Sequence, residues 1–286
     1  MTQSLTMDQE FLSDQYPPLF LRRVSPERWH AQLIFLHAST VHSEYYLPIA
    51  LKWAQAGIRV ILPDLRGHGR SSGPRGHVQN FQQYLKDIER IYTAVQNQHP
   101  APTFMGGESY GALLAYLLCT QNRPRLKGAI LIAPSFGLYF SPPPWVQYLI
   151  KQALYPIWPR LRPIFPLSVE GVANDQNIPR LIERDRNTNR HYTLGFLVNL
   201  WKAQEKVLTE PLPSVPLLAL LSADDGITRN DRTEYILKDH PQRVLRYHYA
   251  SGHSLVADQP EFVFQQSLAW MEERLKAISE PPVMTS

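Results

Sequence analysis

The sequence predicts an α/β protein built around a mostly parallel sheet. Short apolar runs alternate along the chain with longer amphipathic segments, which is typical of strand–helix–strand units. Several of these runs are almost continuously apolar, as strands are when helices cover both faces of a sheet. Of the 286 residues, 44% are hydrophobic and 19% charged, so the chain can bury a sizeable core and is not a disordered polymer.

Seven segments are predicted to be strands because each is a short apolar run bounded by turn residues. They are residues 19–24, 32–37, 59–64, 103–107, 128–134, 216–222 and 243–249. Five segments have apolar residues at helical spacing and are predicted to be helices. They are residues 44–55, 80–98, 110–120, 229–238 and 261–277.

Residues 141–210 interrupt this alternation. Seven prolines fall between Pro142 and Pro166 among several aromatic residues, and amphipathic stretches follow at 178–186 and 191–206. A proline-rich and then helical insertion between two strands is typical of a lid rather than of a core. We therefore expect an α/β core formed by residues 1–140 and 211–286, with residues 141–210 as a cap.

Composition and charge exclude several classes of protein. The single cysteine, Cys119, excludes an internal disulfide, a cysteine-built zinc site and an iron–sulfur cluster. The longest apolar stretches are too short to span a bilayer, and the acidic start MTQSLTMDQEFL lacks the features of a signal peptide. We expect a cytoplasmic protein that at most touches a membrane surface.

The net charge of +4 is concentrated in one part of the chain. Residues 141–206 contain nine Lys or Arg and five Asp or Glu, and no run of five like charges occurs, so a nucleic-acid-binding module is not expected. The basic excess can be a solvated helix face or can attract the cap to anionic lipid.

Residues 107–111, GESYG, match the pattern G-x-S-x-G. A predicted strand leads into this segment and a predicted helix leads out, which is the context of a nucleophile elbow. The sharp turn crowds the backbone, so the positions two before and two after the serine must be small. Ser109 is the candidate nucleophile; the alternative is a glycine-rich turn with a serine at the helix N-cap.

A serine nucleophile needs a general base and an acid that orients the base, expected in the order acid then histidine. His253 follows the last predicted strand, after Gly252, where it can reach the nucleophile. Asp224 and Asp225 both follow the preceding strand, and either can be the acid on this reasoning alone.

The most specific block is residues 64–77, DLRGHGRSSGPRGH. Together with Tyr84 and Asp87 downstream, it resembles the D-x-R-G-H-G-x-S-x-G-x-R-G and F-x-x-Y-x-x-D motifs of the monoacylglycerol lipase and lysophospholipase branch of the α/β-hydrolases, which also includes serine aminopeptidases of the S33 type. The resemblance extends over residues 37–277. We assign this block a structural role.

The resemblance implies an α/β-hydrolase fold with an eight-stranded, mostly parallel sheet and a helical cap after the sixth strand. It places the nucleophile at Ser109, the base at His253 and the acid at Asp225. The acid motif G-x-x-D-x-x-[VC] matches residues 222–228 with a serine in place of the glycine, and this register favours Asp225 over Asp224.

One departure concerns the oxyanion loop. The family carries H-G-x-G-E-H-S there, whereas residues 37–43 are HASTVHS. By position, the backbone N–H groups of Ser39 and Tyr110 are the expected oxyanion donors. A backbone donor survives a change of side chain if the loop keeps its shape, so we expect an altered hole that still works.

The expected function is hydrolysis of monoacylglycerol, lysophospholipid or similar acyl esters through an acyl-enzyme, with no metal or organic cofactor. His37, Trp145, Tyr148 and Leu149 are the expected substrate-binding residues, and the aromatic cap is also suited to contact a lipid surface.

Other functions on the same scaffold stay open. A thioesterase, a perhydrolase or an aminopeptidase uses the same triad; an aminopeptidase needs acids that bind an amine, for which Glu170, Glu183 and Asp185 are candidates. A non-enzymatic sensor of hydrophobic ligands is a further alternative.

Overall fold

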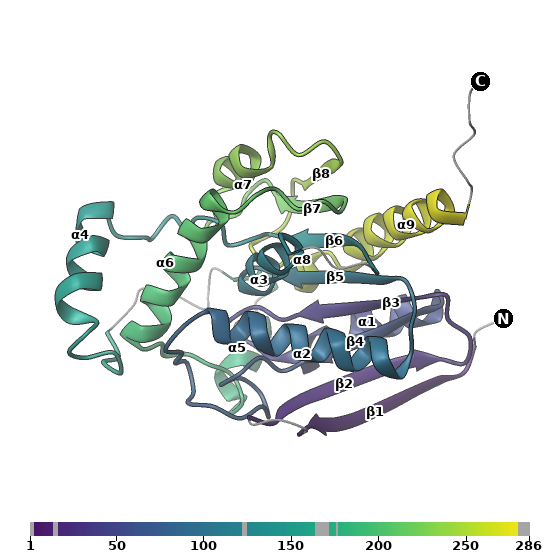
Figure 1. Ribbon diagram of the computed structural model, residues 1–286, viewed down its shortest axis with the longest axis horizontal. Helices are drawn as coiled ribbons and strands as arrows, with labels where there is room; N and C mark the ends of the chain where they lie inside the picture. The colour runs from purple at the N-terminus through teal and green to yellow at the C-terminus, as the bar shows by residue number, and fades with distance from the viewer. Residues whose placement is uncertain (1–2, 14–16, 122–124, 164–171, 176, 280–286) are drawn as a thin grey trace.

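The computed structural model describes residues 3–13, 17–121, 125–163, 172–175 and 177–279. An eight-stranded sheet in the order β1-β2-β4-β3-β5-β6-β7-β8 runs through the centre of the molecule (Figure 1). β2 is antiparallel to its neighbours β1 and β4, and all later pairs are parallel. The strands are β1 Leu5–Leu12, β2 Leu19–Pro26, β3 Ala31–Leu36, β4 Ile58–Pro63, β5 Thr103–Glu108, β6 Leu126–Ile132, β7 Leu217–Ser222 and β8 Arg243–His248.

Helices connect the strands and cover the sheet. They are η1 Ser43–Tyr46, α1 Leu47–Gln55, α2 Gln82–Gln98, α3 Tyr110–Cys119, α4 Pro144–Leu149, η2 Ile150–Leu154, α5 Asn177–Arg184, α6 Leu194–Thr209, α7 Asn230–Leu237, α8 Leu255–Asp258 and α9 Pro260–Ser279. Among them, no helix is both long enough and apolar enough to cross a bilayer.

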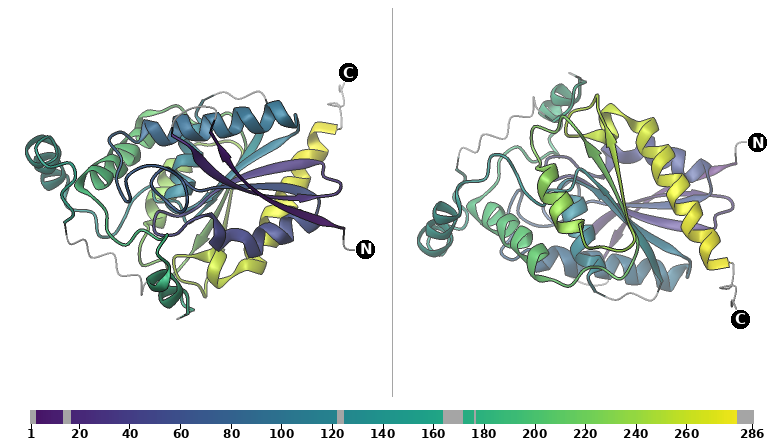
Figure 2. Two further views of the ribbon diagram at one scale, coloured as in Figure 1. Left: turned by 90° about the horizontal axis from the view of Figure 1, so that it is seen from below. Right: turned by 90° about the horizontal axis from the view of Figure 1, so that it is seen from above.

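The core consists of two apolar layers, one on each face of the sheet, because successive strand residues point to opposite faces. Leu33 and Phe35 of β3 belong to the layer that includes Trp53 of α1, whereas Ile34 and Leu36 belong to the layer of α2, α3 and α6. Figure 2 shows α1 and α9 on one side of the sheet and α2 on the other. Because an apolar layer covers each face of the sheet, the central strands β3 and β5 are buried along their whole length.

The seven strands predicted from the sequence are confirmed, and each boundary lies within two residues of the prediction. β1 was not predicted because most of its side chains are exposed, so its sequence lacks a repeating apolar pattern. It pairs with β2 along its whole length, and backbone hydrogen bonds rather than burial define it.

The cap lies between β6 and β7 and contains α4, η2, α5 and α6. α6 packs against α3 and belongs to the apolar core, with Trp201 buried. α4 and η2 have no buried residue, and they project away from the sheet at the left of Figure 1. The cap is therefore anchored by α6 and exposes α4.

Candidate active site

Ser109 occupies the sharp turn between β5 and α3. Its φ is +54°, a value that non-glycine residues rarely adopt and that is found where surrounding structure imposes it. The Ser109 N–H donates to the carbonyl of Ile132 on the neighbouring β6 at 2.9 Å, which holds the turn in place. The side chain then lies at the N-terminus of α3, where the helix dipole favours developing negative charge.

Gly107 and Gly111 are required by this turn. A Cβ on Gly107 would lie 2.5 Å from the carbonyl carbon of Gly111, and a Cβ on Gly111 would lie 2.2 Å from the carbonyl oxygen of Leu36. Both obstructions are backbone atoms, which cannot rotate away. The expectation that small residues flank the serine at these positions thus has a direct steric cause.

Asp225 and His253 form a buried pair at the carboxyl ends of β7 and β8. The Nδ1–H of His253 donates to Asp225 Oδ2 at 2.8 Å, and Asp225 Oδ1 accepts from the amides of Ile227 and Thr228 at 2.8 Å each. Asp224 is exposed. The structure thus brings Asp225, and not its neighbour, to the histidine.

The electrostatics of this pair favour its charged form. Burial works to raise the pKa of Asp225, but the charge of His253 and the hydrogen bonds it receives outweigh burial, so its pKa lies below the ordinary value. Burial works to lower the pKa of His253, but Asp225 and then Glu108 outweigh it, so its pKa lies above the ordinary value. His253 is therefore suited to hold a proton transiently.

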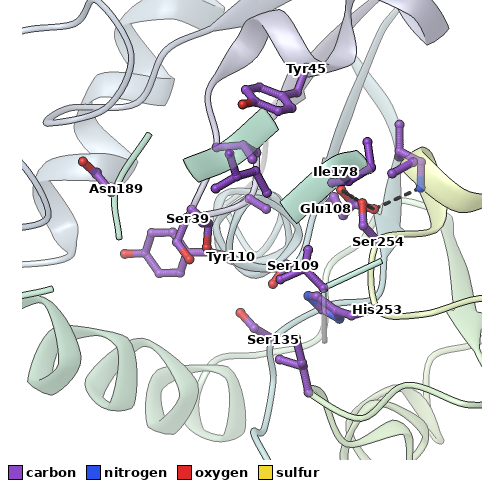
Figure 3. A pocket seen from close by; sticks show the side chains of 18 of the residues that line it. Ser39, Tyr45, Glu108, Ser109, Tyr110, Ser135, Ile178, Asn189, His253 and Ser254 are labelled. Atoms are coloured by element: carbon purple, nitrogen blue, oxygen red, sulfur yellow. Dashed lines mark hydrogen bonds between the residues drawn. The ribbon is translucent and has the colours of Figure 1, made fainter. Parts of the chain in front are cut away.

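Ser109, His253 and Ser135 point toward one another in Figure 3. They line a cavity of about 270 Å³ between the sheet edge and the cap. Its walls are mostly apolar and come from both layers of the molecule: Leu138, Phe196, Leu197, Leu200 and Ile227 on the side of α6, and Ile49, Ile178, Ile182, Val256 and Ala257 on the side of α1 and α5.

Ser39 and Tyr110, the expected oxyanion donors, also line this cavity. The peptide that carries the Ser39 N–H is held by His37, whose Nδ1 lies 2.7 Å from the carbonyl oxygen of Ala38. His37 Nε2 accepts from the Leu65 N–H at 2.9 Å, so the ring proton must be on Nδ1 and is donated to Ala38. Burial lowers the pKa of His37 to about 3, which keeps this neutral tautomer at working pH.

The structure does not support the predicted substrate contacts of four residues. His37 is fully buried beneath the oxyanion loop and does not line the cavity. Trp145, Tyr148 and Leu149 lie on α4 with 67%, 63% and 53% of their surface exposed, and none of them lines the cavity either. Their apolar character was visible in the sequence, but the direction in which α4 projects was not.

Residues 64–77 have the structural role that we assigned. The Asp64 side chain is buried and accepts from the amides of Ser43 at 2.9 Å and Arg70 at 2.7 Å. Arg66 binds Asp87 through two hydrogen bonds of 2.8 Å each. A Cβ on Gly69 would lie 2.1 Å from Asp64 Oδ2, so this glycine is needed for the loop to fold around the carboxylate.

Several cavity residues were not predicted from the sequence. Glu108 is inside the GESYG segment, but at a position that the pattern leaves free. Asn189 and Tyr192 come from the cap: the Asn189 N–H donates to the carbonyl of Thr40 at 2.9 Å, and the Tyr192 hydroxyl donates to Thr40 Oγ1 at 3.3 Å. They carry no motif, because their position depends on how the cap docks.

No group of three or more His, Cys, Asp or Glu suitable for a metal ion occurs in the described part of the chain. Of the acids considered for binding an amine, Glu183 is exposed and Asp185 binds His42 at 2.8 Å, and neither lines the cavity. Glu170 lies outside the described residues.

With the geometry established, comparison with known proteins identifies the family. The sequence profile of the family described as serine aminopeptidase, S33, matches residues 27–260. The chain belongs to this family. It therefore lies in the monoacylglycerol lipase-like branch of the α/β-hydrolases, as the motifs of residues 64–77 predicted.

Individual proteins that are similar to this chain extend this result. The chain is 30% identical to phospholipase YtpA of Bacillus subtilis over 213 residues, covering 72% of this chain and 79% of that protein. It is 24% identical to human monoglyceride lipase over 266 residues, which cover 90% of this chain and 87% of that protein. A soluble variant of monoglyceride lipase from Saccharomyces cerevisiae has the same fold, with a TM-score of 0.78 at 16% identity. The match covers 97% of this chain and 98% of that one.

Proposed function

We propose that this protein is a serine carboxylic-ester hydrolase that acts on monoacylglycerols, lysophospholipids or similar acyl esters. The observation that supports it most directly is the arrangement of Ser109, on a strained turn at a helix N-terminus, beside His253, whose Nδ1–H donates to the buried Asp225 carboxylate. Such an arrangement activates a serine hydroxyl that is otherwise a weak nucleophile at neutral pH.

The chemistry proceeds in two steps. His253 Nε2 takes the Ser109 proton while the serine oxygen attacks the ester carbonyl, and Asp225 holds the imidazole and stabilises its charged form. The oxyanion accepts hydrogen bonds from the Ser39 and Tyr110 backbone N–H groups. His253 then protonates the leaving alcohol, and a water molecule activated by the same imidazole releases the acid from Ser109.

The cavity favours an acyl ester over a peptide with a free amino terminus. Its walls are largely aliphatic and aromatic, which suits a hydrocarbon chain. Glu108 is the acidic residue among the described lining residues, and its carboxylate already accepts three hydrogen-bond donors of the protein. The names of the relatives, phospholipase and monoglyceride lipase, point to the same substrate class.

The decisive experiment is hydrolysis of p-nitrophenyl esters from acetate to palmitate, together with a monoacylglycerol and a lysophospholipid. Ser109→Ala is the test variant, and Ser13→Ala, a substitution at an exposed serine, is its control. Loss of turnover in the first variant alone supports the proposal. Equal turnover in the wild type and Ser109→Ala on every ester would refute ester hydrolysis at this site and favour a ligand sensor.

The cap supports a peripheral contact with lipid as part of this function. Large apolar side chains are exposed on α4, on η2 and on the segment that follows: Trp145, Tyr148, Leu149, Leu154, Ile157, Trp158 and Leu161. Arg160 and Arg162 lie in the same segment. Exposed aromatic side chains next to basic ones are suited to an anionic lipid surface.

Cosedimentation with vesicles tests this contact. We expect tighter binding to anionic than to neutral vesicles, and loss of binding in the double variant Trp145→Ser, Tyr148→Ser. Equal binding to both vesicle types would refute the electrostatic attraction of the cap to anionic lipid. Turnover of a soluble short-chain ester by the same variant separates the two roles of these side chains, because a loss there would restore them as substrate-binding residues.

A further inference from the structure

Glu108 is a buried carboxylate directly before the nucleophile that the two-step chemistry does not use. Only 2% of its surface is exposed. Oε2 accepts from the Tyr46 hydroxyl at 2.7 Å, Oε1 accepts from the Val256 N–H at 3.1 Å, and the Ser254 hydroxyl lies 3.1 Å from both oxygens. Figure 3 shows the Glu108 carboxylate next to Ser254. Its donors come from two separate parts of the chain, η1 and the segment that follows His253.

Tyr46 connects the carboxylate to the oxyanion loop. The Ala38 N–H donates to the Tyr46 hydroxyl oxygen at 3.1 Å, so the phenolic proton is directed to Glu108 rather than back to the loop. Ala38 directly precedes Ser39, and its carbonyl is held on the other side by His37. Both polar groups of the Ala38 backbone are therefore fixed, which sets the direction of the Ser39 N–H.

The second connection is to the loop that carries the base. Ser254 directly follows His253, and Val256 is the second residue of α8. Their hydrogen bonds to Glu108 restrain the chain on the C-terminal side of His253, whereas Asp225 restrains its ring. One carboxylate thus joins the nucleophile turn, the oxyanion loop and the histidine loop.

This chain has a specific need for such a restraint. Its oxyanion loop, residues 37–43, contains none of the glycines that the related motif has, so it must be held in shape by contacts. In other enzymes, a misplacement of about 1 Å in the reacting geometry can reduce turnover roughly a hundredfold.

We infer that Glu108 is a positioning residue of the active site: through Tyr46 it sets the Ser39 amide, and through Ser254 and Val256 it sets the loop of His253. The inference rests on the proposed function of Ser109. Glu108 does not touch the reacting atoms in this scheme, and its hydrogen-bonding capacity is occupied by the protein rather than by a substrate amine.

The charge of Glu108 also affects the pKa of His253, which can be measured and which a merely structural role of Glu108 would leave unchanged. Within the described part of the chain, the charged groups that act on His253 are Asp225, from the loop after β7, and Glu108, from β5; both raise the pKa of the imidazole. Removing the Glu108 charge therefore lowers the pKa of His253, whereas removing the Tyr46 hydroxyl leaves that charge in place.

Two variants separate the contributions. Tyr46→Phe should lower kcat about tenfold with KM within about twofold, and should leave the acid limb of kcat/KM where it is. Glu108→Gln should lower kcat by a similar factor and also move the acid limb to lower pH. The matched control is Ser267→Ala, which removes the buried hydrogen bond that the Ser267 hydroxyl of α9 accepts from Trp53 Nε1 of α1 and should leave kcat unchanged.

The inference does not depend on finding the right ester. The His253 ring is titrated by NMR in the inactive Ser109→Ala protein, with and without Glu108→Gln; a lower pKa in the double variant is expected even if no tested ester is a substrate. An unchanged His253 titration together with kcat within twofold of wild type in Tyr46→Phe would overturn the inference. If Glu108→Gln does not fold, Tyr46→Phe and Ser254→Ala carry the kinetic test.

Discussion

Replacing Gly111 by alanine should damage both stability and activity. The new Cβ would lie 2.2 Å from the carbonyl oxygen of Leu36 and 2.7 Å from that of His37. Since ordinary C···O contacts are roughly 3.3 Å or longer, α3 must move away from β3 by about 1 Å. Overpacking of this kind costs about 3 kcal/mol, at the upper end of the usual range.

The expected effects follow from that shift. A loss of about 3 kcal/mol lowers the melting temperature by roughly 6–12 °C in a chain of this size. The displaced helix carries Ser109 at its N-terminus, so kcat should fall about a hundredfold on a short-chain p-nitrophenyl ester.

A matched glycine serves as the control. At Gly226, nothing lies within 4 Å of the corresponding Cβ, so Gly226→Ala should melt within about 2 °C of the wild type, as surface substitutions usually do. Thermal unfolding followed by circular dichroism and initial-rate kinetics measure both variants. A Gly111→Ala protein with wild-type stability and turnover would refute the steric reasoning for the elbow.

Three further predictions concern individual carboxylates and the base. Asp225→Asn should lower kcat by up to about 10⁴-fold, as in other triad hydrolases, whereas Asp224→Asn should stay within a few-fold; the reverse order in the same ester assay would reassign the acid. kcat/KM should rise with pH as His253 loses its proton, with a midpoint above the ordinary value of 6.5 because Asp225 stabilises the charged ring; a midpoint below it in a pH–rate profile would contradict this. Asp64→Ala leaves the backbone N–H groups of Ser43 and Arg70 without their acceptor and removes a buried carboxylate from the Arg22 guanidinium. It should cost about 3–5 kcal/mol in urea unfolding, and wild-type stability would speak against the structural role of that loop.

The parallel core and the candidate triad could be predicted because their signals are local in sequence. A buried strand such as β3 is a short apolar run, and the turn at Ser109 needs small residues at fixed positions beside it. Asp225 and Asp224 could be ranked only through a family motif, since both follow β7 directly. The exposed strand β1 has no such pattern, because backbone pairing with β2 places it.

Only the tertiary structure decides the contacts between segments that are far apart in the chain. Glu108 and Ser254 are separated by 146 positions, and the same carboxylate meets Tyr46 and, through it, Ala38. His37 was expected at the substrate but supports the oxyanion peptide, and Trp145 was expected in the cavity but lies on an exposed helix. Sequence patterns report periodicity and turn geometry, whereas the direction of a side chain across a cap or between loops depends on how complete elements pack.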